Sequence, residues 1–160
     1  MALQYVQNIE DAEEITQDVF LAVHHSIENF RNDSKISTWI YRITINKSLD
    51  FIKSKQRKKR FAFVTSIFKP NSNELIADQP NFNHPGVEME HKEAMELLFM
   101  KINSLPENQK TALILNKIEQ KNMQECAEIM NLSAKAVESL IHRAKQNLLK
   151  KIDDEKRKTK

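Results

Sequence analysis

Cationic, aromatic and amide side chains are interleaved between residues 31 and 47, a combination that could hold unpaired nucleic-acid bases. The residues are Arg31, Lys35, Trp39, Tyr41, Arg42, Asn46 and Lys47. Cations follow the phosphates of a single strand, while other groups stack on or hydrogen-bond to its bases. A polar loop beside a helix can also enclose a base that has left the stack. The alternative is that Trp39 and Tyr41 belong to a core and that residues 31–37 are an ordinary connection.

A basic run follows, since six of the eight residues from Lys53 to Arg60 are lysine or arginine. Phosphate groups along a nucleic-acid strand are neutralised by clustered cations. For Trp39 alone the core interpretation is favoured, and the basic run is the stronger indication of nucleic acid.

Residues 123–151 have the pattern of a helix-turn-helix. Asn131 accepts a left-handed conformation more readily than other non-glycine residues, and Ser133 can cap the next helix. A buried stripe is predicted by apolar residues that recur every three or four positions, Val137, Ile141, Ala144 and Leu148. The opposite side carries Lys135, Ser139, His142, Arg143, Lys145 and Gln146. Because such a second helix enters the major groove, this side indicates DNA. An ordinary helical hairpin is the alternative.

Five acidic residues lie close together near the start of the chain, with no basic residue among them: Glu10, Asp11, Glu13, Glu14 and Asp18. They fall before or within the first turns of a predicted helix, where the helix dipole favours carboxylates. That explanation covers part of the cluster. The other interpretation is a docking face for a positively charged protein surface, and both stay open at this point.

Nothing in the sequence predicts catalysis, a metal or a cofactor. There is no phosphate-binding glycine loop and no nucleophile motif. The single cysteine, Cys126, excludes an internal disulfide and a cysteine zinc cluster. Glu88 and His91 form one Glu-x-x-His pair, whereas a di-iron carboxylate site needs two. We therefore expect a protein that is not an enzyme.

The elements that must position these residues are predicted to be all helical, because the chain has one glycine and four prolines among long runs of helix formers. Helices are predicted over Ala12–Phe30, with Phe20 on the apolar face, and from Ser37 or Thr38 to Arg60. Further helices are expected over Glu88–Asn103 and Pro106–Ile118, with Ser104 and Glu107 as a capping box.

We expect two small helical modules joined by a flexible linker, with the helix-turn-helix in the second. The first module would span residues 1–60, the linker 61–86, the second module 87–155 and a basic tail 156–160. The formal charge is +2 over residues 1–60, −3 over 61–104 and +4 over 105–160. Two basic modules suit bipartite binding to nucleic acid. No signal peptide or apolar run of membrane-spanning length is seen, which predicts a cytoplasmic protein.

Three segments carry a family resemblance in their order along the chain: Glu10–Phe20, Phe30–Arg60 and Ser104–Ile152. They resemble the core-binding helix, the minus-ten element and the minus-thirty-five domain of RNA polymerase sigma factors of the sigma-70 family, in the extracytoplasmic-function (ECF) group. The resemblance implies a transcription initiation factor that binds core RNA polymerase, directs it to specific promoters and assists promoter melting.

The resemblance also implies roles for individual positions. The clamp helices of the polymerase's largest subunit would be faced by Glu13, Glu14, Gln17 and Asp18. The loop at residues 31–37 would capture an extruded base, within a minus-ten set of Arg31, Lys35, Trp39, Asn46, Lys47, Lys53 and Arg57. The minus-thirty-five element would be contacted by Lys135, Ser139, His142, Arg143 and Lys145. The implied partners are core RNA polymerase, promoter DNA and an anti-sigma factor, with no cofactor.

The sequence departs from the family at two places. A further helix usually precedes the acidic segment, and residues 1–5 match only its end, so we expect the first module to lack its N-terminal helix and to leave Ile15, Phe20 and Trp39 partly uncovered. Glu138 and Leu140 stand where the family often has basic residues. The residues alone also permit a stand-alone helix-turn-helix DNA-binding transcriptional regulator or a helical scaffold.

Overall fold

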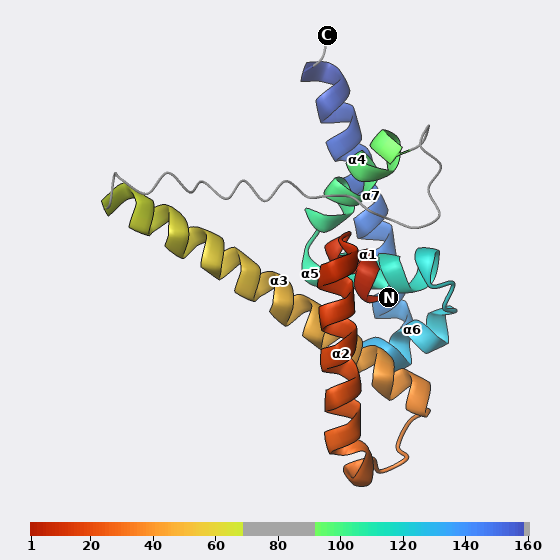
Figure 1. Ribbon diagram of the computed structural model, residues 1–160. Helices are drawn as coiled ribbons and strands as arrows, with labels where there is room; N and C mark the ends of the chain where they lie inside the picture. The colour runs from red at the N-terminus through yellow and green to blue at the C-terminus, as the bar shows by residue number, and fades with distance from the viewer. Residues whose placement is uncertain (69–91, 159–160) are drawn as a thin grey trace.

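The computed structural model describes residues 1–68 and 92–158, and every regular element in these two ranges is a helix, as predicted (Figure 1). In chain order the helices are α1 (Ala2–Val6), α2 (Ile9–Ser26), the 3₁₀ turn η1 (Ile27–Asn29), α3 (Ile36–Phe68), α4 (Lys92–Asn103), α5 (Glu107–Leu113), the π-helical turn η3 (Ile114–Ile118), α6 (Met123–Met130) and α7 (Ala134–Lys158). None of these helices in the described ranges combines the length and apolarity that a membrane crossing requires.

The first module consists of α1, α2 and the first half of α3. Helix α2 starts after Asn8, whose side-chain oxygen accepts a hydrogen bond from the Asp11 backbone N–H at 2.8 Å. Its buried face, Ala12, Ile15 and Val19, packs against both α1 and α3. Ile15 is only 1 % exposed, so the expectation that it would be uncovered is wrong. The short helix α1 supplies the cover, because it packs on α2 and α3 together.

Two aromatic residues at the far end of this module have different environments. The apolar spacing placed Phe20 on the buried face of the helix, and the missing helix was expected to leave it partly uncovered. Phe20 is 70 % exposed, which agrees with the second expectation. Trp39 is half-buried, because its ring packs against that of Phe30 with centroids 5.0 Å apart. Trp39 therefore belongs to the end of the module where α2 and α3 are connected.

Helix α3 is longer than predicted. It runs from Ile36 to Phe68 without interruption, so residues 61–68 are helical and the prediction that the linker begins at residue 61 is wrong. The first proline after the basic run is Pro70, so no residue up to Phe68 lacks a backbone donor or is forced out of the helical conformation. The remainder of the predicted linker and the predicted start of the next helix lie outside the described residues.

The second module confirms the helix-turn-helix. Asn131 adopts the left-handed conformation, with φ 53° and ψ 47°, and ends α6. The Ser133 hydroxyl accepts from the Ala136 backbone N–H at 3.2 Å and so caps α7. The predicted stripe faces inward, with Val137, Ile141 and Ala144 buried. Small residues at Ala127 and Ala144 leave room for close helix packing.

The predicted capping box at Ser104 and Glu107 is wrong. The Ser104 hydroxyl instead donates back to the Lys101 carbonyl at 2.7 Å, which helps to end α4. Helix α5 starts at Glu107, and Pro106 before it offers no side-chain cap. A reciprocal box lies at the start of α6, the first helix of the helix-turn-helix. There the Asn122 side chain accepts from the Glu125 backbone N–H, and the Glu125 carboxylate accepts from the Asn122 N–H, both at 2.9 Å.

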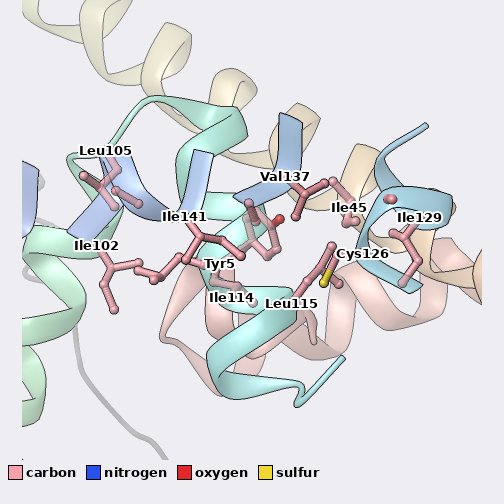
Figure 2. Close-up of a cluster of buried hydrophobic side chains, with 14 of the residues drawn as sticks. Tyr5, Ile45, Ile102, Leu105, Ile114, Leu115, Cys126, Ile129, Val137 and Ile141 are labelled. Carbon is pink, nitrogen blue, oxygen red and sulfur yellow. The ribbon is translucent and has the colours of Figure 1, made fainter. Parts of the chain in front are cut away.

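The two modules pack against each other, which the sequence analysis did not anticipate. Tyr5 of α1 and Ile45 of α3 belong to the same buried cluster as the apolar residues of α4 to α7 (Figure 2). The second half of α3 extends away from this body, and α7 projects past α4 (Figure 1). The described helices thus form one packed unit, with the first module resting on α5 and α6.

Candidate nucleic-acid and protein interfaces

Helix α7 presents the predicted groove-facing residues to solvent. Lys135, Ser139, His142, Arg143 and Lys145 are all exposed. The Ser139 hydroxyl donates to the Lys135 carbonyl at 2.9 Å, and Arg143 Nε donates to the Ser139 carbonyl at 3.2 Å. Both bonds run along the helix, so these two side chains lie against its outer surface. The set forms a polar and cationic surface long enough to follow a groove.

The two positions that depart from the family pattern behave differently. Leu140 is partly buried and packs on the main cluster, so it turns away from the exposed side of α7. Glu138 is exposed among the cationic residues and places one carboxylate on that surface. A carboxylate can accept a hydrogen bond from a cytosine amine, but it repels phosphate. Only Glu138 therefore alters the chemistry of the exposed side.

Four of the predicted minus-ten residues lie along one side of α3. Trp39, Asn46 and Lys53 follow at intervals of just under two turns, and Arg57 comes one turn after Lys53. Asn46, Lys53 and Arg57 are exposed, and Trp39 is half-buried. We call these four residues the α3 line. The intervals between these four residues in the sequence imply this alignment, which was not predicted.

The connection before α3 places two more members of the set near the beginning of the α3 line. Arg31 and Lys35 are exposed, and between them Asn32 has a left-handed backbone with φ 57°. The packed pair of Phe30 and Trp39 supports this connection from beneath. A polar, exposed loop beside an aromatic ring has the composition of a site that could receive an unpaired base.

Lys47 does not join the other minus-ten residues. Its ammonium points toward α2 and lies 3.8 Å from the carboxylate of Asp18, a member of the predicted polymerase-binding set. The side chains are 40 % and 57 % exposed, so the pair is solvated and weak. Both residues remain accessible to a partner.

Asp11 differs in its surroundings from the predicted polymerase-binding residues of α2. Asp11 is structural, since Lys55 Nζ donates to its carboxylate at 2.9 Å and thereby links α2 to α3. Glu13, Glu14, Gln17 and Asp18 are exposed on the side of α2 opposite its buried residues. We call these four residues the acidic face. Leu21, which the sequence analysis did not consider, is 58 % exposed beside them and gives the face an apolar component.

Hydrogen bonds from α3 and α1 reach the second module. Arg42 donates to the Glu128 carbonyl at 2.6 Å and to the Ile129 carbonyl at 3.3 Å, both at the end of α6. The Tyr5 hydroxyl shares a 2.8 Å hydrogen bond with the hydroxyl of Thr111 on α5. Between these contacts lies an open cavity of about 420 Å³ with a mixed lining. Its polar residues are Arg42, Asn46, Asn108, Thr111 and Asn131, and its apolar residues are Ile45, Leu49, Ile129 and Met130.

Burial perturbs two ionisable groups at this contact. It raises the pKa of the Tyr5 hydroxyl to about 12 and lowers the pKa of the Lys110 ammonium to about 8. Lys110 lies 4.7 Å from the centroid of the Tyr5 ring and points its ammonium toward the Tyr5 carbonyl. The charge of Glu107 partly opposes the lowering for Lys110. For Tyr5, the hydrogen bond with Thr111 and the charges of Glu107 and Glu119 on the second module also act on the pKa.

The described residues hold no group of three or more His, Cys, Asp or Glu side chains that could bind a metal ion. Residues 88 and 91, which form the Glu-x-x-His pair, lie outside them. Cys126 is fully buried against α7, and burial raises the pKa of its thiol.

Known protein families match both modules. Residues 1–58 match Sigma-70 region 2, and residues 95–148 match Sigma-70, region 4. The chain is 30 % identical over 151 residues to the ECF RNA polymerase sigma-E factor of Haemophilus influenzae, covering 89 % of this chain and 75 % of that protein. It is 28 % identical over 151 residues to the ECF RNA polymerase sigma factor SigW of Bacillus subtilis, covering 92 % and 78 %.

Solved structures share the fold. One is the sigma factor RpoE in complex with the anti-sigma factor NepR from Bartonella quintana, with a TM-score of 0.64, 18 % identity and coverage of 95 % of this chain and 87 % of that one. Another is CnrH in complex with the cytosolic domain of CnrY, with a TM-score of 0.62, 21 % identity and coverage of 96 % and 78 %. With the two family regions in order and relatives matched across most of its length, the chain belongs to the sigma-70 family of RNA polymerase sigma factors, in the ECF group.

Proposed function

We propose that the chain is a cytoplasmic transcription initiation factor that binds core RNA polymerase, directs it to specific promoters and assists strand opening, without catalysing a reaction itself. The observation that carries this proposal is the presence of a region 2 and a region 4 in one chain, each with an exposed surface of suitable chemistry. A stand-alone regulator that used only the helix-turn-helix would have no use for the acidic face or the α3 line.

The exposed residues of α7 are proposed to recognise the minus-thirty-five element in the major groove. Arg143 and Lys135 can donate to guanine or to phosphate, and Ser139 can bond to any base edge. Glu138 would disfavour phosphate nearby and favour a cytosine at one position. Recognition by a few side chains on one helix gives modest affinity, so the polymerase must supply the rest by holding both modules near the promoter.

The α3 line and the loop before it are proposed to act on the minus-ten region. Arg31, Lys35 and Lys53 would hold phosphates of the non-template strand, while Trp39 and Asn46 would contact bases that leave the duplex. Holding unpaired bases stabilises the opened state relative to the duplex, and no covalent chemistry is needed. Lys47 would contribute only from the α2 side of the helix.

The acidic face is proposed to dock on a positively charged surface of core RNA polymerase. Glu13, Glu14 and Asp18 supply charge, Gln17 adds a hydrogen-bonding amide, and Leu21 adds apolar area. Charges at the rim accelerate and orient an encounter, whereas an apolar side chain at the centre slows dissociation. An anti-sigma factor is a further proposed partner, since one protein of the same fold, the sigma factor RpoE, was solved in complex with the anti-sigma factor NepR.

Reconstituted run-off transcription tests the proposal. Core polymerase with the chain should initiate at a candidate promoter, and core polymerase alone, or a template with a scrambled minus-ten element, should not. Trp39→Ala should reduce initiation on duplex templates more than on templates opened in advance at the minus-ten region. Sequence-specific binding to DNA in the absence of polymerase, with no stimulation of initiation, would support the stand-alone regulator instead.

A further inference from the structure

Helix α7 carries one exposed carboxylate near its start, on the side that the helix-turn-helix turns toward DNA. Glu138 is exposed and follows five residues after Ser133, whose hydroxyl caps the helix. Residues in this part of the second helix are the ones that contact base edges in the major groove. Leu140, the other departure from the family pattern, packs on the main cluster instead. Glu138 is therefore placed where a side chain meets bases.

The carboxylate of Glu138 is not engaged by the described part of the chain. No ion pair or hydrogen bond between described residues involves it. Lys135 and His142 stand one turn before and one turn after it, both exposed. An ion pair with either of them would contribute little in solvent, so it would not compete strongly with a ligand. The carboxylate is available to bind a group on the DNA.

The residue next to Glu138 also offers an acceptor. The Ser139 hydroxyl donates its one hydrogen to the Lys135 carbonyl at 2.9 Å, so its oxygen has only lone pairs left for a ligand. Hydrogen-bond donors lie on either side of this pair of acceptors, at Lys135 and Arg143. The two donors are eight residues apart, which is about 12 Å along the helix. That distance equals three to four base pairs at about 3.4 Å each.

The four bases differ in what they offer a carboxylate in the major groove. Cytosine presents its N4 amine, a donor, and adenine presents its N6 amine beside the acceptor N7. Guanine and thymine present acceptors alone, which a carboxylate repels. The expected order of preference is therefore cytosine, then adenine, with guanine and thymine last. A carboxylate beside a phosphate would instead lower the affinity for every sequence alike.

We propose that Glu138 is a specificity-determining residue of the minus-thirty-five surface, which selects cytosine at an inner position of that element by accepting a hydrogen bond from its N4 amine. The inference rests on the proposed function and deepens it, because it names the base that this position takes. Lys135 and Arg143 act at the flanking positions as donors to guanine or to phosphate. Glu138 lowers the general attraction to DNA and in return discriminates between sequences.

Selection from a randomised pool tests the proposal. Core polymerase with the full chain is mixed with promoter duplexes randomised over the minus-thirty-five element, and the bound duplexes are sequenced. Glu138→Ala and Glu138→Gln are compared with the wild type. Asp154→Asn is the matched control, because it removes one exposed carboxylate from the same helix outside the predicted groove-facing residues. Since Glu138 is exposed, its replacement removes no core contact.

We expect the wild type to enrich cytosine over guanine and thymine at one position by about 5- to 20-fold, the lower part of the range for a specific base contact. Glu138→Ala should lose this preference at that position alone. Glu138→Gln should shift it to adenine, whose N6 and N7 match an amide. Asp154→Asn should keep the preference of the wild type.

A single modified base gives a second readout. N4-methylcytosine still pairs with guanine, but a methyl group replaces the amine hydrogen that faces the major groove. Placed at the preferred position, it should weaken binding of the wild type by the same factor and leave binding of Glu138→Ala unchanged. Equal effects on both proteins would show that Glu138 does not contact this amine.

The outcomes separate this inference from the proposed function. Identical preferences for the wild type and Glu138→Ala would overturn the inference and leave the sigma function intact. A uniform gain in affinity for Glu138→Ala on all sequences would also overturn it, because the carboxylate would then lie beside a phosphate. A preference that depends on Glu138 but favours a base other than cytosine would overturn it as well. If core polymerase selects the same duplexes with and without the chain, the proposed function fails together with the inference.

Discussion

The buried ammonium of Lys110 predicts a specific dependence of stability on pH. Its pKa in the folded chain is about 8, compared with 10.5 for an unperturbed lysine, and burial is the main cause. Because the folded-state pKa lies below the unfolded value, the folded chain releases this proton first. Its stabilising contribution is therefore absent at neutral pH and appears as pH rises through about 8 toward 10.5.

The magnitude follows from the two pKa values. Between pH 7 and pH 9.5 the free energy of unfolding should rise by about 2 kcal/mol from this group alone. Lys110→Met should abolish that rise. At pH 7 the variant should be more stable by about 1–2 kcal/mol, because removal of a charge penalty of about 3 kcal/mol is offset by loss of the contact with the Tyr5 ring.

Urea unfolding of the full chain at several pH values measures this effect. Lys117→Met is the matched control, since Lys117 is exposed in the turn after α5, and it should keep the pH dependence of the wild type. The pKa of Tyr5 is about 12 in the folded chain, compared with 10.0 for an unperturbed tyrosine. Above about pH 10 the unfolded chain therefore ionises this tyrosine first, which lowers the free energy of unfolding. The pH range of the measurement ends at pH 9.5 for this reason. Parallel curves for wild type and Lys110→Met would refute the reasoning, because they would mean that Tyr5 does not cover Lys110.

Three further predictions concern the turn and the two binding surfaces. Asn131→Ala should lower the free energy of unfolding by about 1 kcal/mol, and Asn131→Gly should not, since the residue is left-handed; equal losses would contradict a role for backbone conformation. Arg143→Ala should weaken minus-thirty-five binding by about 1–3 kcal/mol at one base position in a competition assay, whereas equal losses on all sequences would make it a phosphate contact. Glu14→Lys should reduce binding to core polymerase in a salt-dependent manner, with Asp154→Lys on α7 as control; unchanged affinity at low salt would exclude Glu14 from that interface.

The sequence predicted the second module best, because its determinants are local. A left-handed asparagine, a capping serine and one apolar stripe act within a few residues of one another, and each has the predicted conformation. The capping box at Ser104 failed for a local reason as well. Its hydroxyl found a nearer acceptor at the end of α4, a competition that spacing alone does not reveal.

Contacts between distant segments could not be predicted in the same way. Helix α3 is apolar on two sides: Ile40, Ile43 and Phe51 pack on the first module's cluster, whereas Tyr41, Ile45, Leu49 and Ile52 pack on the second module. A sequence pattern shows both sets as hydrophobic and does not say which partner covers each. Most of the predicted binding residues are exposed, but Trp39 is half-buried and Lys47 points toward α2. Arg42, outside the predicted sets, is bound by α6. The binding roles stay predictions.

The interface between the modules combines apolar packing with polar contacts. A purely apolar contact would expose a large hydrophobic surface if it were absent, at a cost that rises with its area. Arg42 of the first module donates to α6, and Lys110 and Thr111 of the second module contact Tyr5. Water could hydrogen-bond to each of these polar groups if the contact were absent. Lys110 would then regain the hydration that burial removed, so its charge opposes the contact at neutral pH. Polar partners thus give the contact between the modules a specific geometry, beside the apolar packing of Tyr5 and Ile45.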